Sequence, residues 1–197
     1  KLTIVDTKAP QETVTTGGDS LYGNKATLDG DTLTYYITES AANATGTGTT
    51  ETLKKHEVPL TRAGRILCQE ASAQAILVKG ALELQSGVLQ NTGGQHIFTV
   101  DRGTLDINGG YIVGGGSDGT LGGGIYVDNG TVNLRGGVIA ANRGSSGGGI
   151  FFQNGTLNIS GGAVTGNEVI NGHTDNGGGI FVQNGTLNLS GGYVTNN

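Results

Sequence analysis

Apolar and polar residues alternate along most of the chain, and this alternation recurs in five similar segments. In the segment 155–164, Leu157 and Ile159 are separated and flanked by small polar residues, which is the period of a strand with one buried face. The five segments are 80–89, 103–112, 130–139, 155–164 and 185–194, with spacings of 23, 27, 25 and 30 residues. The pattern therefore predicts repeated strands and argues against helices.

Each segment carries two further apolar signals. A short strand pattern precedes it, with Ile150 and Phe152 pointing inward in one repeat and Ile180 and Val182 in the next. A third inward position follows a glycine pair, at Leu89, Ile112, Ile139, Val164 and Val194. Three short strands per repeat, joined by glycine and asparagine corners, are typical of one coil of a parallel β-helix. We predict an all-β, right-handed, single-stranded parallel β-helix of the pectin-lyase-like kind, with about five regular coils.

The repeats divide the chain into two parts of one continuous domain. Residues 75–197 hold the regular coils, and residues 1–74 are predicted to form irregular N-terminal coils and a cover over that end. The polar, Thr-rich and Gly-rich stretch 38–57 is expected to be a long loop, and 167–176 a second variable one. Because the chain opens on Lys1 and stops inside a repeat, we expect a fragment of a larger protein.

Composition narrows the class of protein. The chain contains 39 glycines among 197 residues but only two prolines and no G-X-Y period, which excludes collagen. The net charge is −5 and no Lys/Arg run is present, so we predict no nucleic-acid partner. No apolar stretch approaches the roughly 18 residues of a spanning helix, so we predict no membrane insertion by this segment.

One outward column in the repeats is aromatic. If the flanking apolar residues point inward, then Tyr126, Phe151 and Phe181 must point outward on successive coils. Two positions further on, the same strands carry Asp128, Gln153 and Gln183. Exposed aromatic rings beside amides bind sugar rings or a protein partner, so these six residues are the predicted binding site. The alternative is that the rings stack on one another or lie under a loop.

Residues that carry chemistry are scattered. The acidic residues of the coils, such as Asp101, Asp106 and Asp118, do not form the clustered carboxylates that polysaccharide lyases and hydrolases need, although stacking should place Asp106 beside Asn133. The three histidines lie far apart, and Asp118 alone does not complete a calcium repeat. We therefore predict no catalytic residue, no metal site and no cofactor.

The motifs GGGI and F-x-x-N alternate in the repeats, for example at 147–150 and 151–154. They resemble the repeats of chlamydial polymorphic outer-membrane proteins. The full unit, GGGI-aromatic-V-x-N-G-T-L-N-I-x-G-G, is still more similar to β-helix regions of very large cell-surface proteins of Gram-positive anaerobes. The resemblance covers about residues 75–197 and implies an extracellular, surface-exposed adhesin that binds a host protein, of the mucin or immunoglobulin type, or a host glycan. A carbohydrate-active β-helix enzyme and a passive stalk are the competing hypotheses.

Overall fold

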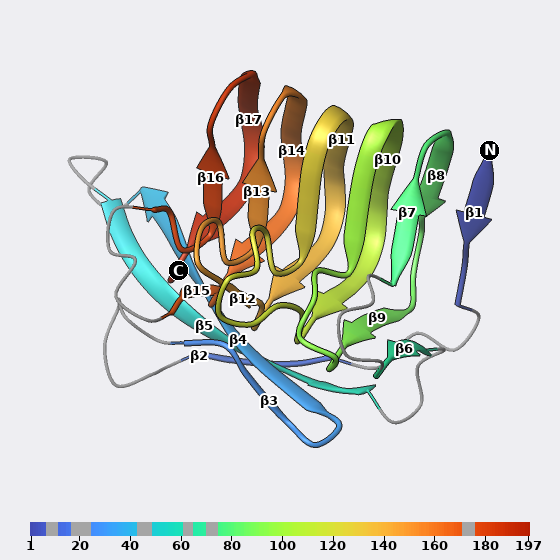
Figure 1. The fold of residues 1–197 in the computed structure, drawn as a ribbon. Coiled ribbons are helices and arrows are strands. Elements are labelled where there is room, and N and C mark those ends of the chain that lie inside the picture. Colours follow the sequence, from blue (N-terminus) through green and yellow to red (C-terminus); the bar gives the residue numbers. More distant parts are fainter. Residues whose placement is uncertain (7–11, 17–24, 43–48, 61–64, 70–74, 171–175) are drawn as a thin grey trace.

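The computed structural model describes residues 1–6, 12–16, 25–42, 49–60, 65–69, 75–170 and 176–197. These residues form a parallel β-helix of about five coils, which lie side by side along the axis of the solenoid (Figure 1). The predicted fold class is thus confirmed.

Each coil is built from the three strand segments that the sequence indicates. The first of the regular coils consists of β7 (Ile76–Val78), β8 (Ala81–Leu84) and β9 (Val88–Asn91). The next two coils are single bent strands, β10 (Phe98–Val113) and β11 (Ile125–Ala140). β13 (Ile150–Phe152) and β14 (Gly155–Thr165) form the fourth coil, and β16 (Ile180–Val182) and β17 (Thr186–Thr195) the fifth. The register shifts between β10 and β11 fall at the predicted corners.

Stacking of identical positions builds the main core. Leu82, Leu105, Val132 and Leu157 are Cα partners on successive coils and are 0–5% exposed. Each coil can bury its inward face only against its neighbours, so the core is one continuous apolar column. In the last coil Leu187 and Leu189 occupy the same inward positions but are 43% and 60% exposed.

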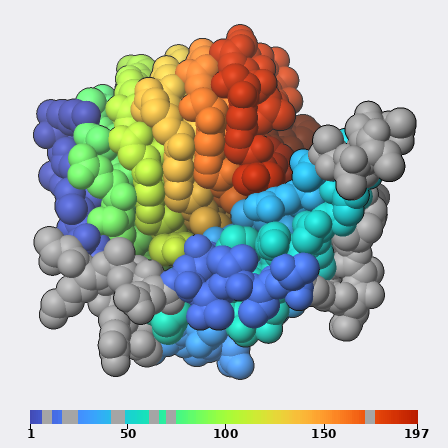
Figure 2. Space-filling view, turned by 180° about the vertical axis from the view of Figure 1, so that it is seen from behind, coloured from blue at the N-terminus to red at the C-terminus, as the bar shows by residue number. Residues whose placement is uncertain are grey.

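The N-terminal part differs from the prediction. β1 (Leu2–Ile4) and β6 (Arg65–Cys68) do join the solenoid, pairing in parallel with β8 and β9. However, β2 (Thr13–Thr16), β3 (Thr27–Asp29), β4 (Thr32–Ala42) and β5 (Thr49–Pro59) form a separate antiparallel sheet in the order β2-β5-β4-β3. This sheet lies along the side of the coils and not over their N-terminal end (Figures 1 and 2).

The predicted loop at 38–57 is mostly strand. It belongs to the β4–β5 hairpin, whose pairs run from Thr32 with Pro59 to Ala42 with Thr49, and residues 43–48 lie outside the described ranges. The sheet is held by a second apolar cluster, in which Leu33, Tyr35 and Val58 pack against outward side chains of the coils. In the other predicted loop, residues 168–169 form β15 (Glu168–Val169), which pairs with β12 (Arg143–Gly144), and residues 171–175 lie outside the description.

Candidate functional site

The solenoid has three outer faces. The covered face is formed by outward residues of the third strand segments, including Val88, Val113, Val138, Ala140 and Ala163, and lies under the antiparallel sheet. The aromatic face is formed by outward residues of the first segments. The polar face is formed by outward residues of the second segments. Among the residues that the structure describes, the antiparallel sheet covers the first of these faces and leaves the other two uncovered.

The aromatic face carries a continuous stack of rings, which we call the aromatic column. Its members are His96, Tyr126, Phe151 and Phe181, with ring centroids 5.4, 5.7 and 5.4 Å apart and nearly parallel planes. The predicted residues therefore do come together in register. His96 was not predicted, because the residue paired with Tyr126 on β10 is Thr99, whose hydroxyl lies 2.7 Å from the His96 Nε2 atom.

The predicted exposure of these rings is wrong for Phe151. Its side chain is 4% exposed, whereas Tyr126 and Phe181 are half-buried. Phe151 lies between two other rings, and glycine-rich segments run close to its backbone. A Cβ added at Gly122 or Gly147 would lie 2.8 or 3.0 Å from a Phe151 backbone atom. The self-stacked alternative thus describes the centre of the column.

Of the polar groups beside the aromatic column, some make hydrogen bonds and others are exposed. The Tyr126 hydroxyl donates a hydrogen bond of 2.5 Å to Gln153 Oε1. Burial, and then the charge of Asp128, raise the pKa of Tyr126, so its hydroxyl remains a donor at neutral pH. Burial lowers the pKa of His96, which keeps that ring neutral. Gln183 is exposed at the last coil.

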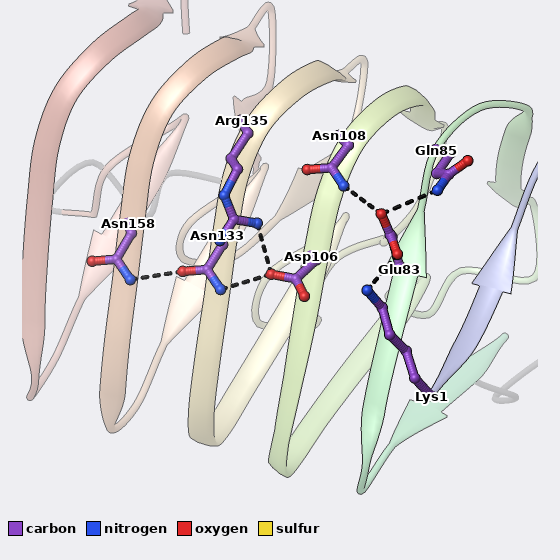
Figure 3. A network of polar contacts seen from close by, with 8 residues as sticks. All are labelled: Lys1, Glu83, Gln85, Asp106, Asn108, Asn133, Arg135 and Asn158. Atoms are coloured by element: carbon purple, nitrogen blue, oxygen red, sulfur yellow. Dashed lines mark hydrogen bonds and ion pairs between the residues drawn. The ribbon is translucent and has the colours of Figure 1, made fainter.

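The polar face presents two columns of side chains in register. One consists of Thr104, Thr131, Thr156 and Thr186; the other consists of Glu83, Asp106, Asn133, Asn158 and Asn188. In the second column each asparagine amide donates to the oxygen of the preceding residue, at 2.8 Å (Asn188 to Asn158), 2.7 Å (Asn158 to Asn133) and 2.8 Å (Asn133 to Asp106). Figure 3 shows the part of this ladder from Asp106 through Asn133 to Asn158, which crosses the strands. The predicted stacking of Asp106 beside Asn133 is confirmed.

The two acidic residues at the start of the ladder each form an ion pair with a basic side chain. Arg135 donates to Asp106 at 2.8 Å, and this bond lowers the pKa of Asp106. Lys1 lies 2.5 Å from Glu83, and this contact, with a bond from Gln85, lowers the pKa of Glu83 (Figure 3). Both carboxylates are therefore ionised at neutral pH, and neither holds a proton to donate.

A second asparagine ladder lies inside the solenoid and was missed at the sequence level. Asn142 and Asn167 are 0% and 2% exposed, and Asn142 Nδ2 donates to Asn167 Oδ1 at 3.0 Å. Asn167 Nδ2 in turn donates to Asn197 Oδ1 at 2.9 Å. The signal was present, since an asparagine stands three positions after the inward residues Ile139, Val164 and Val194. This ladder satisfies backbone groups at the corners, so its role is structural.

The remaining candidate groups stay apart. Nδ1 of His56 lies 2.9 Å from Glu12 on the antiparallel sheet, His96 belongs to the aromatic column, and His173 and Asp175 lie outside the described residues. In the described ranges, no three His, Cys, Asp or Glu side chains form a group that could hold a metal ion. Nor do these ranges contain a helix long and apolar enough to cross a membrane.

Comparison of the chain with known protein families, with curated proteins and with solved structures gives no match.

Proposed function

We propose that the protein is a non-enzymatic binding module of a bacterial cell surface, and that its polar face binds a glycan chain. The observation that carries the proposal is the register of the polar face. Threonine hydroxyls repeat on four successive coils and asparagine amides on three of them, in two columns that run along the solenoid axis. Strand spacing in a sheet is about 4.8 Å, which is close to the length of a sugar unit, so successive residues of a glycan can meet equivalent groups.

The free hydrogen-bonding capacity of this face supports the proposal. Asn133 and Asn158 each use one amide hydrogen and one lone pair of the amide oxygen in the ladder, and keep the other of each. Within the described part of the chain, the hydroxyls of Thr131 and Thr156 make no hydrogen bond and are half-exposed. Two half-buried rings, Tyr126 and Phe181, lie one corner away and can stack against a sugar ring.

The charges favour binding over catalysis. A general acid in glycoside cleavage needs a carboxyl group with a raised pKa, whereas cations lower the pKa of both Glu83 and Asp106. The cell-surface location rests on the resemblance of the GGGI and F-x-x-N motifs to surface-protein repeats. A host glycan, such as those of mucin, is the ligand that this location favours.

A glycan array with the whole chain tests the proposal. The variant Thr131→Val/Thr156→Val keeps side-chain shape but removes two hydroxyls, and we expect it to weaken binding of a captured glycan about 30-fold, because two hydrogen bonds contribute roughly 1 kcal/mol each. The matched control is Thr52→Val, a half-exposed threonine of β5 on the antiparallel sheet, which should bind normally.

Three results would overturn the proposal. If Tyr126→Ala/Phe181→Ala abolishes binding while the double valine variant binds normally, the aromatic column is the site and the polar face is not. Turnover of uronate or neutral polysaccharides, with or without calcium, would show that the protein is an enzyme. A chain that captures no ligand on the array or from host secretions would be a passive stalk.

A further inference from the structure

A groove separates the antiparallel sheet from the corners of the solenoid, and neither the polar face nor the aromatic column contributes to it. Its volume is about 550 Å³, which suits a mono- or disaccharide. Residues from both parts of the fold line it, among them Lys25 and Leu28 on one side and Gln90, Ala141, Arg143 and Glu168 on the other.

The wall of this groove holds the amide of Gln90, which has unused hydrogen-bonding capacity. Gln90 is 7% exposed, and its carboxamide makes no hydrogen bond with any residue that the structure describes. It lies close to the corner at Gly114, where an added Cβ would be 3.4 Å from Gln90 Nε2 and 3.2 Å from Leu28 Cδ2. The Gln90 amide is not one of the fully buried polar groups that lack a partner, so it is accessible from the groove, where a ligand hydroxyl can pair with it.

The rim of the groove carries more positive than negative charge. Lys25 Nζ lies 2.5 Å from Glu168 Oε1, and Arg143 Nε lies 3.7 Å from Glu168 Oε2. Two cations therefore share one carboxylate, and both cationic side chains remain more than 60% exposed. An incoming carboxylate can take the place of Glu168 beside Arg143, while Leu28 and Ala141 offer an apolar surface to a sugar ring.

We propose that this groove is a second binding site, and that its ligand is an acidic sugar unit, that is, a sugar ring that carries a carboxylate. The ring hydroxyls pair with the Gln90 carboxamide, and the carboxylate pairs with Arg143 and Lys25. The inference goes beyond the proposed function, because it needs none of the residues of the polar face.

Methyl glucuronoside and methyl glucoside are matched probes, since they differ only in the carboxylate. Titration of the whole chain, followed by calorimetry or by amide chemical shifts, should show that the glucuronoside binds about tenfold more tightly. Gln90→Leu should weaken both probes about tenfold. Arg143→Gln should weaken only the glucuronoside, by about fivefold, whereas Glu168→Gln should tighten it by a similar factor because the internal competitor is gone.

The chain offers a matched control for the charge effects. Asp101 is also shared by two cations, Lys79 at 3.4 Å and Arg102 at 3.0 Å, but this group lies outside the groove. Arg102→Gln should therefore leave both affinities unchanged. The same result is expected for Thr131→Val/Thr156→Val, which separates this site from the polar face.

The proposal is overturned if the glucuronoside shows no saturable binding, if both glycosides bind equally, or if Glu168→Gln weakens binding. Inorganic sulfate that binds as tightly as the glucuronoside would reduce the site to a plain anion site and refute the sugar assignment. Arg143 and Glu168 are surface residues, so their variants keep the test decisive even if Gln90→Leu lowers the melting temperature.

Discussion

Removal of the Asn167 side chain should be among the most damaging single substitutions in this protein. The side chain is 2% exposed, and its amide donates to Ile139 O at 2.9 Å and to Asn197 Oδ1 at 2.9 Å. Its oxygen accepts from the backbone N of Asn142 at 3.2 Å and from Asn142 Nδ2 at 3.0 Å. Asn167→Ala thus removes these four hydrogen bonds from a side chain that is almost fully buried.

The magnitude follows from those four bonds. An intramolecular hydrogen bond contributes about 1 kcal/mol, so Asn167→Ala should lower the free energy of unfolding by about 4 kcal/mol. This is a large share of the roughly 5–15 kcal/mol that stabilises an ordinary domain. For a chain of this length it corresponds to a fall in Tm of roughly 8–16 °C.

Urea denaturation followed by circular dichroism measures the effect, with Asn154→Ala as the matched control. Asn154 is exposed and makes one hydrogen bond of 3.3 Å to Asp128 O, so its removal should cost less than about 0.5 kcal/mol. Asn167→Asp keeps the shape but sets a carboxylate oxygen against the Ile139 carbonyl. It should be as destabilised as the alanine variant at neutral pH and recover below about pH 4, where protonation restores a donor.

One result would refute this reasoning. If Asn167→Ala unfolds at the same urea concentration as Asn154→Ala, the interior ladder contributes no net stability. The register of the corners would then depend on apolar packing alone.

Three further substitutions test other parts of the fold. Phe151→Ala empties a buried position in the aromatic column and should cost about 3–5 kcal/mol in urea unfolding, whereas Phe151→Leu should cost less than half as much. Arg135 lowers the pKa of Asp106, so this carboxylate stabilises the fold above pH 4, and the contribution is lost as pH falls through the lowered pKa. In Asp106→Asn the free energy of unfolding should therefore depend less on pH in the acid range. Gly166→Ala should lower the free energy of unfolding by about 2–4 kcal/mol, because residue 166 has φ +60° and a Cβ would lie 2.2 Å from Ala26 N. An unchanged Tm would contradict the contact between Ala26, which directly precedes β3, and this corner.

The repeats made the coils predictable. In a strand the side chains alternate strictly, so positions such as Leu157 and Ile159 had to share one face, and equal positions in successive repeats had to stack. The same logic placed Tyr126, Phe151 and Phe181 in one column. It could not predict their exposure, because exposure depends on which glycine-rich segment runs beside each ring.

The position of the antiparallel sheet was not predictable in the same way, although a signal existed. Val88, Val113 and Val138 are outward on the third strand segments, and such apolar positions mark a covered face. Their pattern does not say which part of the chain covers them. The groove at Gln90 exists only because β3 lies beside the corners, so no local pattern indicated it.

The sequence by itself determined the solenoid, because its period of two and the spacing of its repeats are local properties that stacking converts directly into register. Only the tertiary structure decided which outer face is covered and where the groove lies. Those outcomes depend on contacts between distant segments, such as the 2.7 Å bond from Thr165 Oγ1 to Tyr36 O, which joins residues 129 positions apart. Such contacts do not change the alternation of apolar and polar residues along the chain, because each partner follows the alternation of its own strand. They therefore cannot be predicted from that alternation.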